Sequence, residues 1–196
     1  MRSAFVIGLL ALLMAPLALM TGAARAASGD LDELMRTLAQ RRHGKVEFVE
    51  QHFMALLSRP LESSGVLIYD APDRLEKRTL EPRPESLLLE GDELTIRRGR
   101  HIHVLDVQAY PQIGPLVASM RATLAGDLEA LARLFRVEFD GDLERWTLIL
   151  VPRENDLAKA VSQVRIDGIR DRLFRVEIRA TDGDRSLLTL RDHPAP

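Results

Sequence analysis

The stretch "GVLIYDAPDRLEKRTLEP", residues 65–82, decides the fold class of this chain. A largely apolar run follows Gly65 and ends at Pro72, and in a second run apolar and charged residues alternate up to Pro82. A period of two is typical of a β-strand with one apolar and one polar face. Proline cannot donate to a strand ladder and marks the turns. The stretch therefore predicts two antiparallel strands that share an apolar face.

Strand patterns continue on both sides of this stretch. In the first half, short strands are predicted at residues 46–49, 61–69, 75–79, 87–89 and 94–97. In the final third, they are predicted at residues 135–139, 146–151, 164–166, 173–179 and 186–190. Asp-Gly pairs at 140–141, 167–168 and 182–183 are predicted to form hairpin turns. So many hairpins predict one long antiparallel sheet, curved or closed as a barrel.

Helical spacing of apolar residues occurs in three places. Asp30 is predicted as the N-cap of an amphipathic helix, and Asp127 as the N-cap of a short one. Between them, a stripe on residues 113–124 includes Leu116, Val117 and Met120. The first helix carries Leu31, Leu34, Met35 and Leu38, and the last carries Leu128, Leu131 and Leu134. The sequence therefore predicts a mainly β protein with helices.

The N-terminus has the three parts of a secretory signal peptide. Arg2 precedes an apolar run at residues 4–20, and Ala24-Arg25-Ala26 forms a cleavage site. A membrane anchor is the alternative, although the run is only just long enough to cross a bilayer. We predict a signal peptide at residues 1–26 and one exported, soluble domain at residues 27–196.

Composition excludes several classes of protein. The chain has no cysteine, which excludes disulfide scaffolds, thiolate metal sites, cysteine nucleophiles and a lipidated N-terminal cysteine. Without Arg2 and Arg25, 25 of the 27 basic residues remain against 29 acidic ones, a net charge of −4. This balance gives no electrostatic case for binding nucleic acid.

No motif in the sequence predicts catalysis, a metal or a cofactor. His101 and His103 would point to the same side of a strand, but no third ligand is evident, so we predict a surface strand edge. The acidic residues fall at turns or at polar strand positions, which is typical of a solvated sheet face. Nucleophilic serine motifs, phosphate loops and zinc-binding helices are absent from the sequence. We therefore expect a binding protein and not an enzyme.

Apolar surface remains, and two interpretations of it stay open. The sheet and the helices could enclose a dry core. Alternatively, a curved sheet covered by helices could be only partly filled and leave a cavity for a lipid.

Two longer stretches favour the second interpretation by resemblance. "VEFVEQHF" (residues 46–53) and "PLESSGVLIYDAPDRLEKRTLEPRPESLLLEGDELTI" (residues 60–96) resemble the LolA family of periplasmic lipoprotein carriers. The matching positions are Phe48 and Glu50, Gly65 and Pro72, Pro82, and Gly91-Asp92. The resemblance implies an incomplete, strongly curved antiparallel barrel, covered by helices around a hydrophobic cavity that receives acyl chains.

The same resemblance implies tasks for particular residues. From the sheet, Phe48, Leu67, Tyr69 and Leu75 would face the cavity. From the covering helix, Leu116, Val117 and Met120 would close it. Trp146, Leu148 and Leu150 would form the far wall.

The chain departs from the housekeeping carriers at two positions. Ala71 stands where those carriers have an arginine that holds the helical cover, and Lys77 stands where they tend to have tryptophan. By these differences the chain is more similar to the LolA-related branch that serves lipid or lipid-linked pigment export. A monomeric periplasmic carrier is implied, with lipid or acylated cargo, an inner-membrane donor complex and an outer-membrane acceptor. A true lipoprotein carrier is the alternative, and a lipid-sensing regulator or an envelope hydrolase is more distant.

Overall fold

The computed structural model describes residues 21–109, 114–153 and 156–192. Its main element is an 11-stranded antiparallel sheet in the order β6-β5-β4-β3-β2-β1-β11-β10-β9-β8-β7. The first six strands are β1 His43–Phe53, β2 Leu61–Asp70, β3 Arg74–Glu81, β4 Glu85–Glu90, β5 Glu93–Arg98 and β6 His101–Asp106. The others are β7 Phe135–Gly141, β8 Trp146–Pro152, β9 Val161–Ile169, β10 Arg172–Ala180 and β11 Arg185–Asp192.

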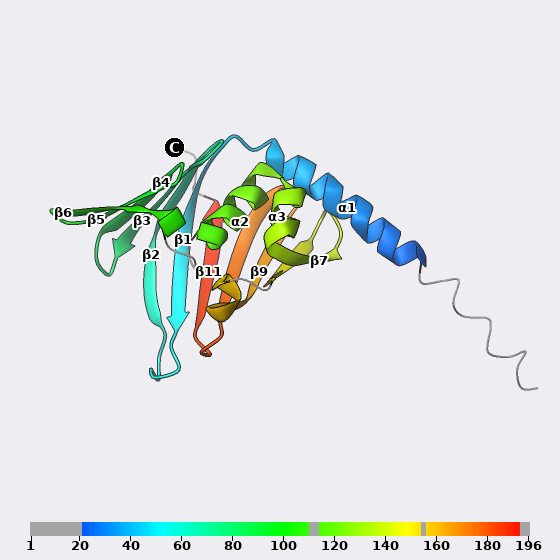
Figure 1. The fold of residues 1–196 in the computed structure, drawn as a ribbon. Helices are drawn as coiled ribbons and strands as arrows, with labels where there is room; N and C mark the ends of the chain where they lie inside the picture. The colour runs from blue at the N-terminus through cyan, green and yellow to red at the C-terminus, as the bar shows by residue number, and fades with distance from the viewer. Residues whose placement is uncertain (1–20, 110–113, 154–155, 193–196) are drawn as a thin grey trace, which may run out of the picture.

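The sheet curls strongly without closing, and β6 and β7 form its two edges (Figure 1). Helices lie along one side of it: α1 Thr21–Ala39, α2 Gly114–Ala125 and α3 Leu128–Leu134, with the short 3-10 turns η1 Val107–Ala109 and η2 Asp156–Lys159. The predicted architecture, an incomplete and strongly curved antiparallel barrel with helices, is confirmed.

We call the face that carries Trp146, Leu148 and Leu150 the inner face, because these side chains pack with those of the helices. Strand register extends this face across the sheet, since alternate residues point to opposite sides. Leu148 of β8 pairs with Ile166 of β9, which pairs with Val176 of β10. Val176 in turn pairs with Leu188 of β11, and Leu188 pairs with Glu50 of β1. The inner face is therefore continuous from β7 to β6.

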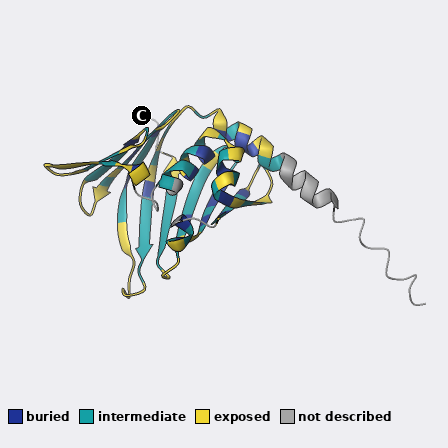
Figure 2. Ribbon diagram, viewed as in Figure 1, coloured by how far each residue is buried: buried dark blue, intermediate teal, exposed yellow. Residues whose placement is uncertain are grey.

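The main core lies at one end of this face. It joins α1, α2 and α3 to strands β7 to β10, and its most buried members are completely enclosed (Figure 2). Of the predicted helix positions, Leu34, Met35, Leu38 and Leu131 belong to it. At about 25 cal/mol per Å² of apolar surface, burial in this cluster is the main stabilising term of the fold.

Two of the predicted helix starts have different outcomes. Asp127 is the N-cap of α3, because its carboxylate accepts a hydrogen bond from the Ala130 N–H at 2.9 Å. The prediction for Asp30 is wrong, since α1 is already helical from Thr21 and Asp30 lies within it. Helical propensity upstream of Asp30, in the alanine-rich segment, explains the longer helix.

The Asp167-Gly168 hairpin prediction is also wrong. Both residues lie inside β9, and the chain turns at Arg170 and Asp171. A Cβ at Gly168 would stand 2.0 Å from the Trp146 ring, so glycine is needed here to admit a side chain from β8 and not to make a turn. The turn predicted at Asp140-Gly141 is displaced too, because both residues pair within β7 and the connection to β8 follows at residues 142–145. By contrast, Asp182-Gly183 lies in the turn between β10 and β11, with Gly183 at a φ of +95°.

The opening stretch contributes β2, β3 and the turn between them. Both of its prolines follow cis peptide bonds, Ala71-Pro72 and Glu81-Pro82. At Gly65 the register between β2 and β3 shifts, and a Cβ would stand 1.9 Å from the Arg78 carbonyl oxygen. The glycine therefore permits a close approach of β3 that any other residue would prevent.

Most of the predicted signal peptide, residues 1–20, lies outside the described residues, and residues 21–26 form the start of α1. The division at residue 26 remains a prediction. In the described part of the chain, no helix is both long enough and apolar enough to cross a membrane.

Candidate functional site

The predicted sheet residues all lie on the inner face. Phe48 pairs with Gly65, while Leu67 and Tyr69 follow on the same side of β2, and Tyr69 pairs with Leu75 of β3. Phe48 and Tyr69 are buried, with 2% and 8% of their surface exposed, and burial raises the pKa of the Tyr69 hydroxyl. Leu67 and Leu75 are only partly buried.

Trp146, Leu148 and Leu150 occupy a different setting on that face. Each is at most 1% exposed and belongs to the main core beneath α1 and α3. The Trp146 indole N–H donates to the Arg170 carbonyl at 2.8 Å, which fixes the ring over Gly168. In this structure, other side chains of the protein enclose all three residues, which are therefore part of the core.

An apolar row crosses the other end of the inner face. Register aligns one residue from each of the strands β2 to β6, and the row consists of Tyr69, Leu75, Leu89, Leu94 and Leu105. A second row, beside it, consists of Leu67, Lys77, Leu87, Ile96 and His103. With strands about 4.8 Å apart, each row spans roughly 19 Å, a length suited to an extended acyl chain.

Few of these side chains are fully buried. Among the described residues, the buried apolar side chains outside the main core are Phe48, Tyr69, Leu89 and Val107, while Leu87 and Ile96 remain partly exposed. Figure 2 shows the difference as a change from dark blue near the helices to teal and yellow toward β6. This end of the inner face is therefore apolar but incompletely covered.

The buried side of helix α2 is not its predicted apolar stripe. Its buried side consists of small residues, Ser119, Ala122 and Thr123, and α2 packs on α1, α3 and η1. Val117 is partly buried and Met120 is 36% exposed; for Leu116 only the backbone is described. Small residues let the helices approach closely, while the larger side chains of Val117 and Met120 stay incompletely buried.

An ion pair lies on the inner face and includes Lys77, the β3 member of the second row. Glu50 accepts from Lys77, from Ser186 at 2.9 Å and from Ser63 at 3.4 Å, and Lys77 Nζ stands 5.0 Å from the centre of the Phe48 ring. Burial raises the pKa of Glu50, but these hydrogen bonds outweigh it and hold the pKa below its ordinary value. Glu50 is therefore ionised at neutral pH, and its partner Lys77 places a charge within the second row, between Leu67 and Leu87.

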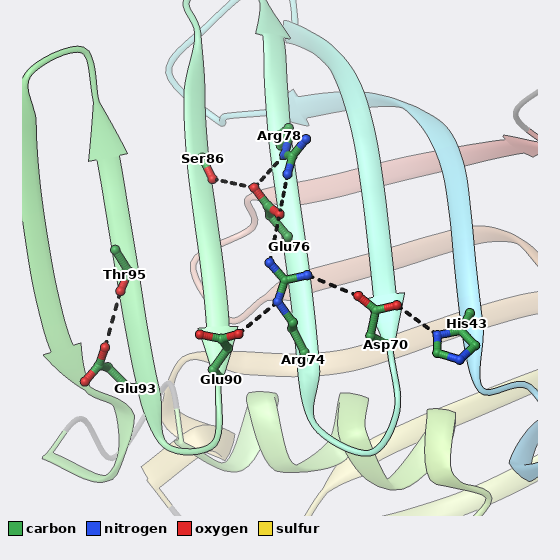
Figure 3. Close-up of polar contacts among 9 residues, drawn as sticks. All are labelled: His43, Asp70, Arg74, Glu76, Arg78, Ser86, Glu90, Glu93 and Thr95. Atoms are coloured by element: carbon green, nitrogen blue, oxygen red, sulfur yellow. Dashed lines mark hydrogen bonds and ion pairs between the residues drawn. The ribbon is translucent and has the colours of Figure 1, made fainter.

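The outer face carries a chain of ion pairs across β1 to β4 (Figure 3). Arg74 contacts Asp70 at 3.1 Å and Glu90 at 2.8 Å, and Arg78 contacts Glu76 at 2.5 Å. Glu76 is only 5% exposed, and the Arg78 hydrogen bond in particular keeps its pKa low. Glu76, one of the acidic residues predicted on a solvated face, is therefore buried. The Arg74 pairs join β3 to β2 and β4, whereas the Arg78–Glu76 pair lies within β3.

Two hollows of the surface lie on this outer face and not over the apolar rows. The larger has a volume of about 350 Å³ and is lined by Arg74, Glu76, Arg78, Ser86, Leu88, Thr95 and Arg97. The smaller, about 200 Å³, is lined by Glu47, Phe48, Val49, Ser64, Gly65, Val66, Leu80 and Arg191. Of the predicted site residues, Phe48 alone lines one of them.

His101 and His103 lie on β6, the edge strand, and both are exposed, as the sequence predicts. Within the described ranges, no group of three histidine or acidic side chains is placed to hold a metal ion.

Sequence reasoning missed the leucines of β4 to β6 as site candidates. Leu87, Leu89 and Leu94 fall in predicted strands but not in the predicted site, and Leu105 falls in neither. Each strand is short, and its apolar face is evident only from the pairing register. Alternation within "ESLLLEGDELTI" is weak, since three leucines are consecutive at 87–89. The signal that could have found them is the turn at Gly91-Asp92, which fixes Leu89 opposite Leu94.

Comparison with known proteins gives one match at the level of sequence families. The model described as "Outer membrane lipoprotein carrier protein LolA-like" matches residues 23–192. No curated protein matches the chain.

Solved structures that match the chain include a LolA superfamily protein from Nitrosomonas europaea, at 10% identity and a TM-score of 0.43, over 87% of this chain and 94% of that one. The Pseudomonas aeruginosa MucA/MucB complex matches at 13% identity and a TM-score of 0.45, over 85% of this chain and 59% of that one. LprF from Mycobacterium bovis matches at 12% identity and a TM-score of 0.31, over 87% of this chain and 96% of that one. On the family match, which spans nearly the whole chain, this protein belongs to the LolA-like family of outer membrane lipoprotein carrier proteins.

Proposed function

We propose that this protein is a periplasmic carrier that moves a lipid, glycolipid or lipid-linked pigment between the inner and outer membranes. Its acyl chain lies on the apolar rows of β2 to β6, beneath the apolar stripe of α2. Membership of a carrier family supports the general role.

One observation carries the proposal: two apolar surfaces of the same molecule are both incompletely buried. Leu67, Leu87 and Ile96 on the sheet are partly exposed, and so are Val117 and Met120 on α2. A monomeric protein normally covers such surface, because each exposed CH₂ group that could be buried costs about 0.8 kcal/mol. An acyl chain would complete the burial that the protein leaves unfinished.

The chemistry required is binding without covalent change. A long acyl chain cannot cross an aqueous compartment uncovered, since the cost grows with each CH₂ group. Incomplete cover has a second use, because cargo held by modest apolar contact can be released at the acceptor. A donor complex at the inner membrane and an acceptor at the outer membrane complete the proposed route.

A true lipoprotein carrier is the second candidate. The printed description of the family favours it. Lys77, paired with Glu50 beside the apolar rows, places charge where a wholly apolar surface would suit several acyl chains better, and this favours a cargo with a polar head. The two candidates differ in cargo and not in mechanism.

The test is to purify the protein from its native host and to identify co-purifying molecules by mass spectrometry. Recovery of a lipid, glycolipid or pigment with acyl chains supports our first proposal, and recovery of acylated peptides supports the second. An empty protein that also fails to bind a fluorescent fatty acid would exclude both.

A further inference from the structure

Arg121 of α2 is incompletely paired in an enclosed position. Its Nη1 atom donates to Asp92 Oδ1 at 3.2 Å, and its side chain is 25% exposed while that of Asp92 is 56% exposed. Asp92 lies in the turn between β4 and β5, so this contact joins the covering helix to the sheet.

The other two guanidinium nitrogens, Nε and Nη2, are closed to solvent and have no hydrogen-bond partner in the described part of the chain. These two atoms form one edge of the guanidinium plane, the edge that binds a carboxylate or phosphate through two parallel hydrogen bonds. Arg175 Nε is the third such nitrogen in the described residues, but it stands 4.0 Å from Asp167 Oδ2. Arg121 therefore has a whole unoccupied edge.

Unmet donors of this kind are unfavourable, because a buried polar group without a partner loses its hydration and gains nothing. Other cations on the inner face do not share this condition. Lys77 pairs with Glu50, and Arg98 pairs with Glu85. An anion that reached this face would find its strongest unmet donors at Arg121.

Arg121 also stands beside the first apolar row, next to its members on β4 and β5. The turn that holds Asp92 separates Leu89 from Leu94, and the Asp92 carbonyl accepts from the N–H of buried Val107 at 2.9 Å. On α2 itself, Val117 and Leu124 lie four residues before and three residues after Arg121, on the adjoining surface of the helix. A charged edge thus adjoins apolar surface on both the sheet and the helix.

We propose that the Nε–Nη2 edge of Arg121 binds the anionic head group, a carboxylate or a phosphate, of an acyl ligand that lies on these rows. This inference rests on the proposed carrier function and adds a requirement for a negative charge at the head of the ligand. Because both nitrogens are closed to solvent, α2 shifts to admit the head group, and the ligand then supplies the missing acceptors.

The test compares ligands that differ only in charge. A dansyl-labelled undecanoic acid and its methyl ester are titrated against the purified protein, against Arg121→Met, and against Arg133→Met as a matched control. Arg133 is an exposed arginine on the neighbouring helix α3, paired with Glu129. The wild type and the control should bind the acid roughly tenfold more tightly than the ester, the scale of a charge-assisted pair. Arg121→Met should abolish this preference and keep ester affinity within about twofold.

Two further variants keep the test decisive if Arg121→Met is unstable. Arg121→Lys retains the charge without the planar edge and should retain only part of the preference. Asp92→Asn removes the competing carboxylate and should increase the acid-to-ester preference. Displacement of the ester by dodecyl phosphate or by laurate, each against dodecanol, then distinguishes a phosphate head from a carboxylate head.

The outcomes distinguish a failure of the head-group inference from a failure of the proposed carrier function. If neither probe binds the wild type, the carrier function itself is wrong. If both probes bind equally well, or if Arg121→Met and Arg133→Met keep the same preference, the head-group inference is overturned and the carrier function stands.

Discussion

Both ends of the inner face carry apolar side chains on alternate strand positions, but these side chains are enclosed at one end and partly exposed at the other. Around β7 to β10, Trp146, Leu148 and Leu150 meet helices and are enclosed; we call this the packed half. Around β1 to β6, Leu67, Leu87 and Ile96 face the same way and stay partly exposed; we call this the open half. One half is filled by protein side chains, and the other, which we propose as the ligand surface, is incompletely covered.

An apolar pattern alone therefore does not identify a core. Both halves have strands with apolar alternate positions, and the helices cover only one of them closely. Glu50 and Lys77 place an ion pair on the inner face of the open half, where a dry core would pay a large desolvation penalty.

Leu148→Ala and Leu87→Ala compare the halves directly. Leu148 is fully buried, so its truncation should lower the free energy of unfolding by about 2 to 5 kcal/mol, through lost burial and an unfilled cavity. Leu87 is partly exposed, and the same change should cost about 1 kcal/mol or less. Urea unfolding followed by circular dichroism measures both. Equal losses would show that the open half is core as well.

Gly168→Ala tests how tightly the packed half is filled. The new Cβ would stand 2.0 Å from the Trp146 ring, so we expect a loss of about 1 to 3 kcal/mol from overpacking. In a Trp146→Leu background the same change should cost much less, because the two sites share one contact. Thermal unfolding of the four proteins of this cycle gives the coupling, and additive losses would refute the contact.

Leu67→Glu tests the open half as a binding surface. A carboxylate among the apolar rows should weaken binding of a fluorescent fatty acid by at least about tenfold, and it should change unfolding by about 1 kcal/mol or less because the site is already partly hydrated. Val66→Glu, one residue away and on the outer face, is the control and should keep full binding. If the Leu67 variant loses stability and binding together, the surface belongs to the core.

The ion pair of the open half should appear in the acid stability of the protein. The pKa of Glu50 is lowered in the folded state, so its contribution is complete above its ordinary pKa of 4.5 and is lost as the pH falls through the lower, folded pKa. As the pH falls, the free energy of unfolding of Glu50→Gln should decrease by less than that of the wild type, with a difference of about 1 kcal/mol or less. Lys77→Met should also reduce this loss, because it removes the main partner that holds the folded pKa down against the effect of burial.

Urea unfolding between pH 7 and pH 3 measures this effect as a difference from the wild type, because other acidic residues such as Glu177 and Asp171 also have lowered pKa values. Glu129→Gln, at an exposed helical pair, is the control and should follow the wild type. Identical curves for wild type and Glu50→Gln would show that the pair contributes nothing.

Much of the fold could be predicted because its signals are local. Strand alternation, Asp127 as a helix cap and the glycine and proline turns depend on neighbours in the sequence, and most of these predictions are confirmed. The failures occurred where a distant partner decides. Gly168 signals a turn in the sequence, but the Trp146 ring, twenty-two residues earlier, determines its use.

The candidate site was less predictable for the same reason. Sequence spacing placed Val117 and Met120 on the apolar side of α2, but only packing shows that the close contacts of that helix use Ser119, Ala122 and Thr123. The residues proposed for the site, Phe48, Leu67, Tyr69 and Leu75 among them, share one face by register, and their role as a ligand surface remains a prediction.

By itself, the sequence determined the mainly β architecture, the order of strands and helices, and the apolar face of "GVLIYDAPDRLEKRTLEP", because periodicity and turn chemistry act over a few residues. The tertiary structure alone decided which part of that face is filled. It also decided that Gly65 admits β3, that Lys77 pairs with Glu50, and that one edge of Arg121 is enclosed without a partner. These outcomes depend on contacts between segments far apart in the chain, and no local pattern encodes them.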